Sequence, residues 1–151
     1  MKNLTNHIAA IAITVWVGGL WMIGYLAVPT LFYSQPDRQL AGLLAGKMFE
    51  TLGYVGIVCG LYLLLQRWMD VGKQVSRDIS AWLVLVMLLI TLATLFYIQP
   101  LMAALKMQAL PLEVMQSPLA GRFGMWHGIS STLYLLESLL GAALIDVLRP
   151  K

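Results

Sequence analysis

The sequence has little charge and almost no cysteine. Only 11% of its 151 residues are charged and 60% are hydrophobic, whereas soluble domains have about 25% charged residues. This composition excludes an ordinary soluble globular protein. The single cysteine, Cys59, excludes an intrachain disulfide and any metal site built from several cysteines. The ten Lys and Arg residues are scattered without a basic run, so we expect no nucleic-acid partner.

Four apolar segments follow one another along the chain, each bounded by charged residues, proline or both. A helical segment of about 20 apolar residues crosses the hydrocarbon core of a bilayer. The sequence therefore predicts an all-α fold, a four-helix transmembrane bundle with up-down topology and a single integral membrane domain over residues 1–151. We expect the spans at about residues 8–33, 40–66, 79–105 and 127–148.

The helix boundaries are marked by single residues. We expect the second helix to begin near Asp37, and the third to continue through Gln99-Pro100 to Lys106, because a proline kink is tolerated in a membrane bundle. Residues 107–126 are expected to connect the third and fourth spans at the membrane interface, as a loop or short amphipathic helix.

The distribution of Lys and Arg predicts the orientation. With four spans, one side of the membrane holds six of the ten basic residues and the other holds four. The larger group is Lys2, Arg67, Lys73, Arg77, Arg149 and Lys151. The smaller group is Arg38, Lys47, Lys106 and Arg122. Because positive residues accumulate on the cytoplasmic side, we expect both termini in the cytoplasm, in a bacterial inner membrane.

Glycine pairs on the second helix indicate close helix packing. Gly42-x-x-x-Gly46 and Gly56-x-x-x-Gly60 both follow the small-xxx-small spacing that brings membrane helices together. Packing within the bundle explains such glycines. Glycine-rich faces of this kind are also where a membrane-protein partner or a second copy of the chain would bind, beside the lipid bilayer itself.

Polar residues on the fourth helix form the main candidate site. At 100° per residue, one helical face carries His127, Ser131, Tyr134 and Ser138, with Ser130 and Glu137 at its edge. We expect this stripe to face the bundle interior. Glu137 lies near the centre of the bilayer, where a carboxyl group is expected to be neutral and either joins helices by hydrogen bonds or relays a proton or ion.

The two histidines suggest a cofactor. His7 begins the first span and His127 begins the fourth, so they lie on opposite sides of the membrane and do not ligate one haem together. Either is a single-ligand candidate for haem. The thioether of Met125 and the imidazole of His127 would suit copper(I), although methionine also fills gaps in apolar helices. The candidate binding residues are therefore His7, His127, Ser131, Tyr134 and Glu137, with His127 and Met125 as metal ligands and no catalytic residue.

Three stretches together resemble a known family. They are His7 with Trp16-Val17-Gly18-Gly19 and Gly24-Tyr25-x-x-x-Pro29-x-Leu31-Phe32, Leu92-Ala93-Thr94 with Gln99-Pro100, and Arg122-Phe123-x-x-x-His127-Gly128-x-Ser130-Ser131. This set resembles the transmembrane protein 205-like family and its bacterial branch of unknown function, which implies a small four-span protein. The first helix alone also resembles the copper-resistance D and membrane protoporphyrinogen oxidase types, which implies His7 as a haem ligand.

Three functions remain open at this level. We expect a non-catalytic bundle that binds a small ligand, a metal ion or haem, or is related to transport. An accessory or assembly subunit that packs against other membrane proteins is the alternative. A haem-dependent membrane oxidoreductase is the third, although the third span lacks the Lys and His residues that the resemblance to the oxidase type implies.

Overall fold

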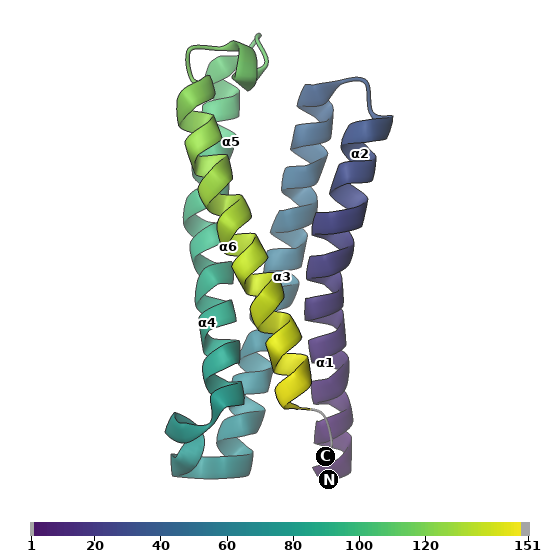
Figure 1. Cartoon of the computed structure of the whole chain (residues 1–151), viewed down its shortest axis with the longest axis vertical. Helices are drawn as coiled ribbons and strands as arrows, with labels where there is room; N and C mark the ends of the chain where they lie inside the picture. Colours follow the sequence, from purple (N-terminus) through teal and green to yellow (C-terminus); the bar gives the residue numbers. More distant parts are fainter. Residues whose placement is uncertain (1, 149–151) are drawn as a thin grey trace.

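The computed structural model describes residues 2–148, and these form an all-helical bundle of four long apolar helices (Figure 1). Each is long and apolar enough to cross a membrane, so the predicted fold class is confirmed. The elements are α1 (Lys2–Met22), η1 (Ile23–Ala27), α2 (Val28–Ser34), α3 (Arg38–Val71), η2 (Gly72–Arg77), α4 (Ile79–Ala93), η3 (Thr94–Ile98), α5 (Gln99–Ala109), η4 (Val114–Gln116) and α6 (Ala120–Val147).

The helix ends reflect local chemistry. Asp37 caps α3, since its carboxylate accepts from the backbone N–H groups of Gln39 and Leu40. Asp78 caps α4 in the same way, through the N–H of Ser80. The chain continues as a helix past Pro100 and ends α5 at Ala109.

The first and third long helices each contain a π turn followed by a proline. The turn η1 precedes Pro29 and the turn η3 precedes Pro100, and both prolines occupy the second position of the next α-helical segment. Proline has no N–H, and its ring clashes with the carbonyl four residues earlier. A π turn widens the helix at that point, so the chain passes each proline without leaving the helix.

The fourth helix is longer than its predicted span. α6 begins at Ala120, ahead of the expected start at His127. The segment with Gly121, Arg122 and Gly124 is less apolar than the rest, so a hydropathy argument places it in the connector although it is helical. The connector consequently shrinks to residues 110–119, of which Val114–Gln116 form a short 3-10 turn.

The helices pack tightly in one half of the bundle and in pairs in the other. Near the termini, α1, α3, α4 and α6 share a core that includes Trp16, Met87 and Leu144. Toward the connector, α2 stays beside α3 and α5 beside α6 (Figure 1), and Lys106 of α5 joins the two pairs by donating to the carbonyl of Gly42 on α3 at 2.9 Å. α6 crosses the bundle diagonally, starting next to α5 and ending next to α1 (Figure 1). All of its buried residues therefore lie in its second half, from Glu137 to Leu144.

The glycine pair on α3 receives a large side chain. A Cβ at Gly56 would lie 2.6 Å from Nε1 of Trp16, and one at Gly60 would lie 3.1 Å from the far edge of the same indole. Both glycines thus form a groove for the ring of Trp16, which is almost fully buried. The predicted packing role applies to Gly56 and Gly60, whereas a Cβ at Gly46 would meet no atom of the described residues within 4 Å.

Candidate functional site

A buried carboxyl group lies where three helices meet. Glu137 on α6 is only 4% exposed, and its Oε1 lies within hydrogen-bond distance of Oγ1 of Thr91 on α4, at 2.6 Å. The indole of Trp16 on α1 is its second hydrogen-bond partner. The side chains of Thr91 and Trp16 are themselves buried. Three polar groups from α1, α4 and α6 therefore meet inside the apolar core.

The geometry of this cluster favours a neutral carboxyl group. Oγ1 of Thr91 lies 3.0 Å from the carbonyl of Met87 and 2.6 Å from Glu137, yet a hydroxyl has one proton to donate. If Glu137 is protonated, it donates to Thr91, Thr91 donates to Met87, and the indole donates to the carboxyl. Within the described residues the ion pairs are Lys47–Glu50 and Arg67–Asp78, so no ion pair there balances a charge on Glu137.

Tyr134, one turn before Glu137 on α6, inserts into the π turn of the first span. Its hydroxyl donates to the carbonyl of Leu20, which in an α-helix would accept from the N–H of Gly24. The backbone of Gly24 is a further hydrogen-bond partner of this hydroxyl. A Cβ at Gly24 would lie 2.2 Å from Cε1 of Tyr134, so only glycine leaves room for the phenol ring. Tyr134 thus bonds to the backbone of the first span directly before the π turn.

Two more aromatic rings surround Tyr134. The ring of Tyr25 lies 6.0 Å from it and that of Phe49 lies 5.2 Å from it, both in edge-to-face geometry. Such contacts between rings are favourable. The phenol therefore links α3 and α6 to the π turn of the first span.

The outer half of the predicted polar stripe does not face the interior. His127 and Ser131 are exposed, and only Tyr134, Glu137 and Ser138 turn inward. The expectation of one continuous interior stripe is therefore wrong for His127 and Ser131, because α6 crosses the bundle diagonally and the same face leaves the core toward its N-terminus. His127 stacks on Phe123, with ring centroids 5.9 Å apart, and Ser131 donates to the carbonyl of His127 at 2.9 Å.

The residues predicted to hold haem or copper lie apart. His7 is exposed near the start of α1, at the opposite end of the bundle from the start of α6, which carries Met125 and His127 (Figure 1). Met125 is exposed and two residues from His127, so the two side chains point to different sides of the helix. In the part of the chain that the structure describes, no group of three His, Cys, Asp or Glu side chains is placed to hold a metal ion. A two-ligand haem within one chain does not fit this placement. The assignment of these residues as ligands stays a prediction.

Sequence reasoning missed three members of the inner cluster. Trp16 enters the sequence argument only through the family resemblance, Gly24 enters through that resemblance and as a glycine expected to permit close helix packing, and Thr91 carries no prediction. Thr91 is one of two threonines in an otherwise apolar stretch of α4 and η3, and that polar character was the available signal. Its partner on α6 depends on helix rotation and crossing, which the sequence pattern does not specify.

Comparison with known proteins identifies the family. A family model described as a domain of unknown function (DUF4149) matches residues 11–111. The chain belongs to this family. No curated protein and no solved structure matches the chain. The DUF4149 match contains Trp16, Gly24 and Thr91, whereas Tyr134 and Glu137 on α6 lie beyond it. Membership of this family does not assign an activity to the chain.

Proposed function

We propose that this four-span protein is a transport-related module that binds a small ligand near the membrane centre, beside Tyr134 and Glu137. The observation that carries the proposal is the pair of π turns η1 and η3, each followed by a proline. They lie in the first and third spans, which occupy corresponding positions in the two halves of the chain, and π turns are frequent at functional sites. Spans with a proline at corresponding positions of two halves are typical of binding sites in membrane transporters.

The polar groups of α6 lie beside both π turns. Tyr134 bonds to the carbonyl of Leu20, before the first π turn. Glu137 bonds to Thr91, which lies three residues before the second π turn begins at Thr94. An ionisable residue inside a membrane span is costly and usually serves binding or proton movement. The neutral carboxyl and the phenol would supply both hydrogen-bond donors and acceptors to a small ligand.

The arrangement of helix pairs supports access from the connector side. In the described chain, η1 and α2 have no buried residue, and the part of α6 before Glu137 has none either. On the same side, Ala41 of α3 and Leu105 of α5 are buried, and Lys106 of α5 donates to the carbonyl of Gly42 on α3 at 2.9 Å. A path to Tyr134 would therefore require the α2–α3 pair to separate from the α5–α6 pair with loss of the Lys106–Gly42 hydrogen bond, while the core around Trp16 and Leu144 stays in place.

Cysteine labelling in native membranes tests this path. In a Cys59→Ala background, which removes the only natural thiol, Ser138→Cys places a thiol inside the bundle and Leu139→Cys places one on its lipid-facing side. We expect a small water-soluble thiol reagent to modify position 138 much faster than position 139. Equal, negligible labelling of both positions would overturn the proposal, because a ligand path must admit water.

A second candidate function is an accessory subunit, and a different set of glycines favours it. Cβ atoms built at Gly121, Gly124 and Gly128 on α6 would meet no atom of the described chain within 4 Å. These glycines are therefore not used for packing inside the bundle, and small residues on an open helix face suit contact with another membrane helix. A partner subunit or a second copy of the chain would pack there.

Valine substitutions separate the accessory role from folding. Gly124→Val and Gly128→Val should leave the isolated bundle intact and abolish a native complex on non-denaturing gels. Gly56→Val is the matched control, because its side chain would collide with Trp16 and unfold the bundle itself. If the open-face variants keep the same complex, or if the wild-type chain forms none, the accessory function is refuted.

We further propose that both termini lie in the cytoplasm of a bacterial cell. The basic residues Arg67, Lys73 and Arg77 near the α3–α4 turn support this orientation, whereas Arg149 and Lys151, which also entered the expectation, lie outside the described residues. Ser76 and Gln116 are exposed in the turns at opposite ends of the bundle. In intact cells, an impermeant thiol reagent should label Gln116→Cys and spare Ser76→Cys, and the reverse pattern would invert the topology.

A further inference from the structure

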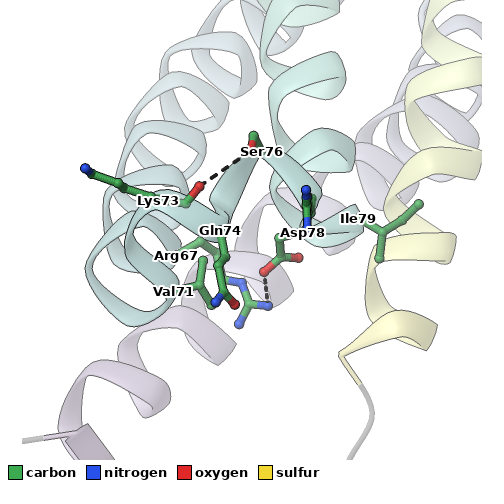
Figure 2. Close-up of a pocket in the computed structure, with 8 residues that line it drawn as sticks. Arg67, Val71, Lys73, Gln74, Ser76, Asp78 and Ile79 are labelled. Atoms are coloured by element: carbon green, nitrogen blue, oxygen red, sulfur yellow. Dashed lines mark hydrogen bonds and ion pairs between the residues drawn. The ribbon is translucent and has the colours of Figure 1, made fainter.

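An open cavity, lined by both charged and apolar side chains, lies at the turn between α3 and α4. Its volume is about 770 Å³. Figure 2 shows residues from the end of α3, from η2 and from the start of α4 around it. The charged and amide side chains that line it are Arg67, Lys73, Gln74, Arg77 and Asp78. The cavity includes no residue of the Tyr134 and Glu137 cluster. It lies on the opposite side of the core from the π turns η1 and η3.

The charges of this cavity do not balance. Asp78 is the only acid among the lining residues, and it forms an ion pair with Arg67. Burial raises the pKa of Asp78, but hydrogen bonds from Ser80 and the positive charge of Arg67 outweigh it and hold the pKa below 3.8. The carboxylate is therefore ionised at neutral pH. Arg77 and Lys73 have no counterpart among the lining side chains, which leaves the cavity with excess positive charge.

Arg67 retains a free donor. One guanidinium nitrogen contacts Asp78, but its Nε is buried and has no hydrogen-bond partner in the described part of the chain. Buried donors normally have partners. Lys73 extends away from Arg67 and Asp78, while its carbonyl faces the hydroxyl of Ser76 (Figure 2). Lys73 thus supplies long-range positive charge, and the arginines offer planar donors.

The cavity lies at the depth of lipid headgroups. It is at the end of two membrane-spanning helices, and exposed tryptophans flank it on both, Trp68 on α3 and Trp82 on α4. Tryptophan is enriched at the membrane–water interface. Trp82 also donates to the carbonyl of Ser76 at 2.9 Å, which holds the turn against α4. Gly72, with a φ of 55°, reverses the chain at the end of α3.

We propose that this cavity binds the phosphate group of an anionic phospholipid. Arginine donates pairs of hydrogen bonds to phosphate oxygens, and anionic lipids supply phosphate at this depth in the membrane. The net positive charge favours an anionic lipid over a zwitterionic one. This site is independent of the proposed transport function, because it uses neither the π turns η1 and η3 nor the carboxyl of Glu137.

Lipid retention by the full-length protein tests the site. Purified protein in detergent is mixed with equal amounts of phosphatidylglycerol and phosphatidylcholine, and bound lipids are counted by native mass spectrometry. We expect preferential retention of phosphatidylglycerol. Each basic side chain near the surface is worth a factor of about five in binding, so Arg77→Gln should weaken retention about fivefold and Lys73→Gln somewhat less. Arg67 is left intact because its pair with Asp78 joins α3 to α4.

Two controls make the result specific. Arg122→Gln removes the same single charge at the opposite end of the bundle and should leave retention unchanged. An equal loss in this control, or no loss in the cavity variants, would overturn the site. Excess inorganic phosphate is added to the wild-type complex as a further arm. Continued retention supports a lipid, and displacement would overturn the lipid assignment in favour of a soluble phosphate.

Discussion

Replacing Gly24 with alanine should destabilise the bundle through a single collision. The new Cβ would lie 2.2 Å from Cε1 and 2.7 Å from Oη of Tyr134. Both contacts are far inside van der Waals distance, so the phenol must leave the π turn. Its expulsion breaks the hydrogen bond to the carbonyl of Leu20 and the ring contacts with Tyr25 and Phe49.

The expected cost follows from these lost interactions. An interhelical hydrogen bond in a membrane protein contributes about 0.6–2 kcal/mol, and each edge-to-face ring contact contributes about 0.5–1.5 kcal/mol. The lost interactions sum to about 2–5 kcal/mol, and Gly24→Ala should reduce the free energy of unfolding by about 1–4 kcal/mol once the better helix propensity of alanine is subtracted. Alanine forms helices better than glycine by up to about 1 kcal/mol, so helix propensity opposes the loss and a measured decrease must come from the collision.

A double-mutant cycle with Tyr134→Ala isolates this effect. Unfolding by SDS in mixed micelles, followed by tryptophan fluorescence, gives the free energy for the wild type, both single variants and the double variant. Once the phenol is gone, Gly24→Ala should cost nothing or be slightly stabilising. The coupling energy between the two positions should then be about 2–5 kcal/mol. An equal cost of Gly24→Ala in both backgrounds would refute the contact between Tyr134 and the π turn.

The other predictions concern one buried and two peripheral groups. Glu137→Gln should preserve stability, because an amide still donates to Thr91 and accepts from Trp16. Glu137→Leu should lower the free energy of unfolding in detergent by about 0.6–2 kcal/mol. A leucine variant more stable than wild type would show that the carboxyl is kept for function. Asp78→Asn keeps the helix cap and loses the ion pair, so thermal melts should show a constant deficit at neutral pH. Because the folded-state pKa of Asp78 is lowered by Ser80 and Arg67, this deficit should disappear only in acid, below the usual pKa range of an aspartate; a deficit that already shrinks near neutral pH would contradict this. If haem binds, His7→Ala should abolish the Soret band and His127→Ala should retain it, and colourless protein without copper after expression with ample haem would exclude both cofactors.

The fold was predictable because it depends on the lengths of apolar runs. Four such runs of sufficient length leave an all-helical bundle as the main solution, since backbone groups in lipid must be paired within a helix or a closed barrel. Individual residues also marked boundaries correctly. Asp37 accepts from the first N–H groups of α3, and the helix continues through Pro100 as expected.

The partners of Glu137 were not predictable in the same way. Depth along α6 follows from counting residues, which is why a buried carboxyl was expected. Which neighbouring side chain reaches it depends on the rotation of α1 and α4 about their own axes. Trp16 on α1 and Thr91 on α4 therefore meet Glu137 through a geometry that no spacing rule on α6 contains.

The exposed part of the polar stripe has a physical cause that also bears on function. Hydropathy reports transfer out of water and does not distinguish a face buried in lipid from one buried in protein. Because α6 crosses the bundle diagonally, the same helix face is buried at Glu137 and exposed at Ser131. The hydroxyl of Ser131 donates to the carbonyl of His127 on the same helix. A ligand that enters from the connector side, as proposed above, would therefore meet hydroxyls bonded to their own helix first, and would have to displace the hydrogen bonds of Tyr134 and Glu137 in order to bind there.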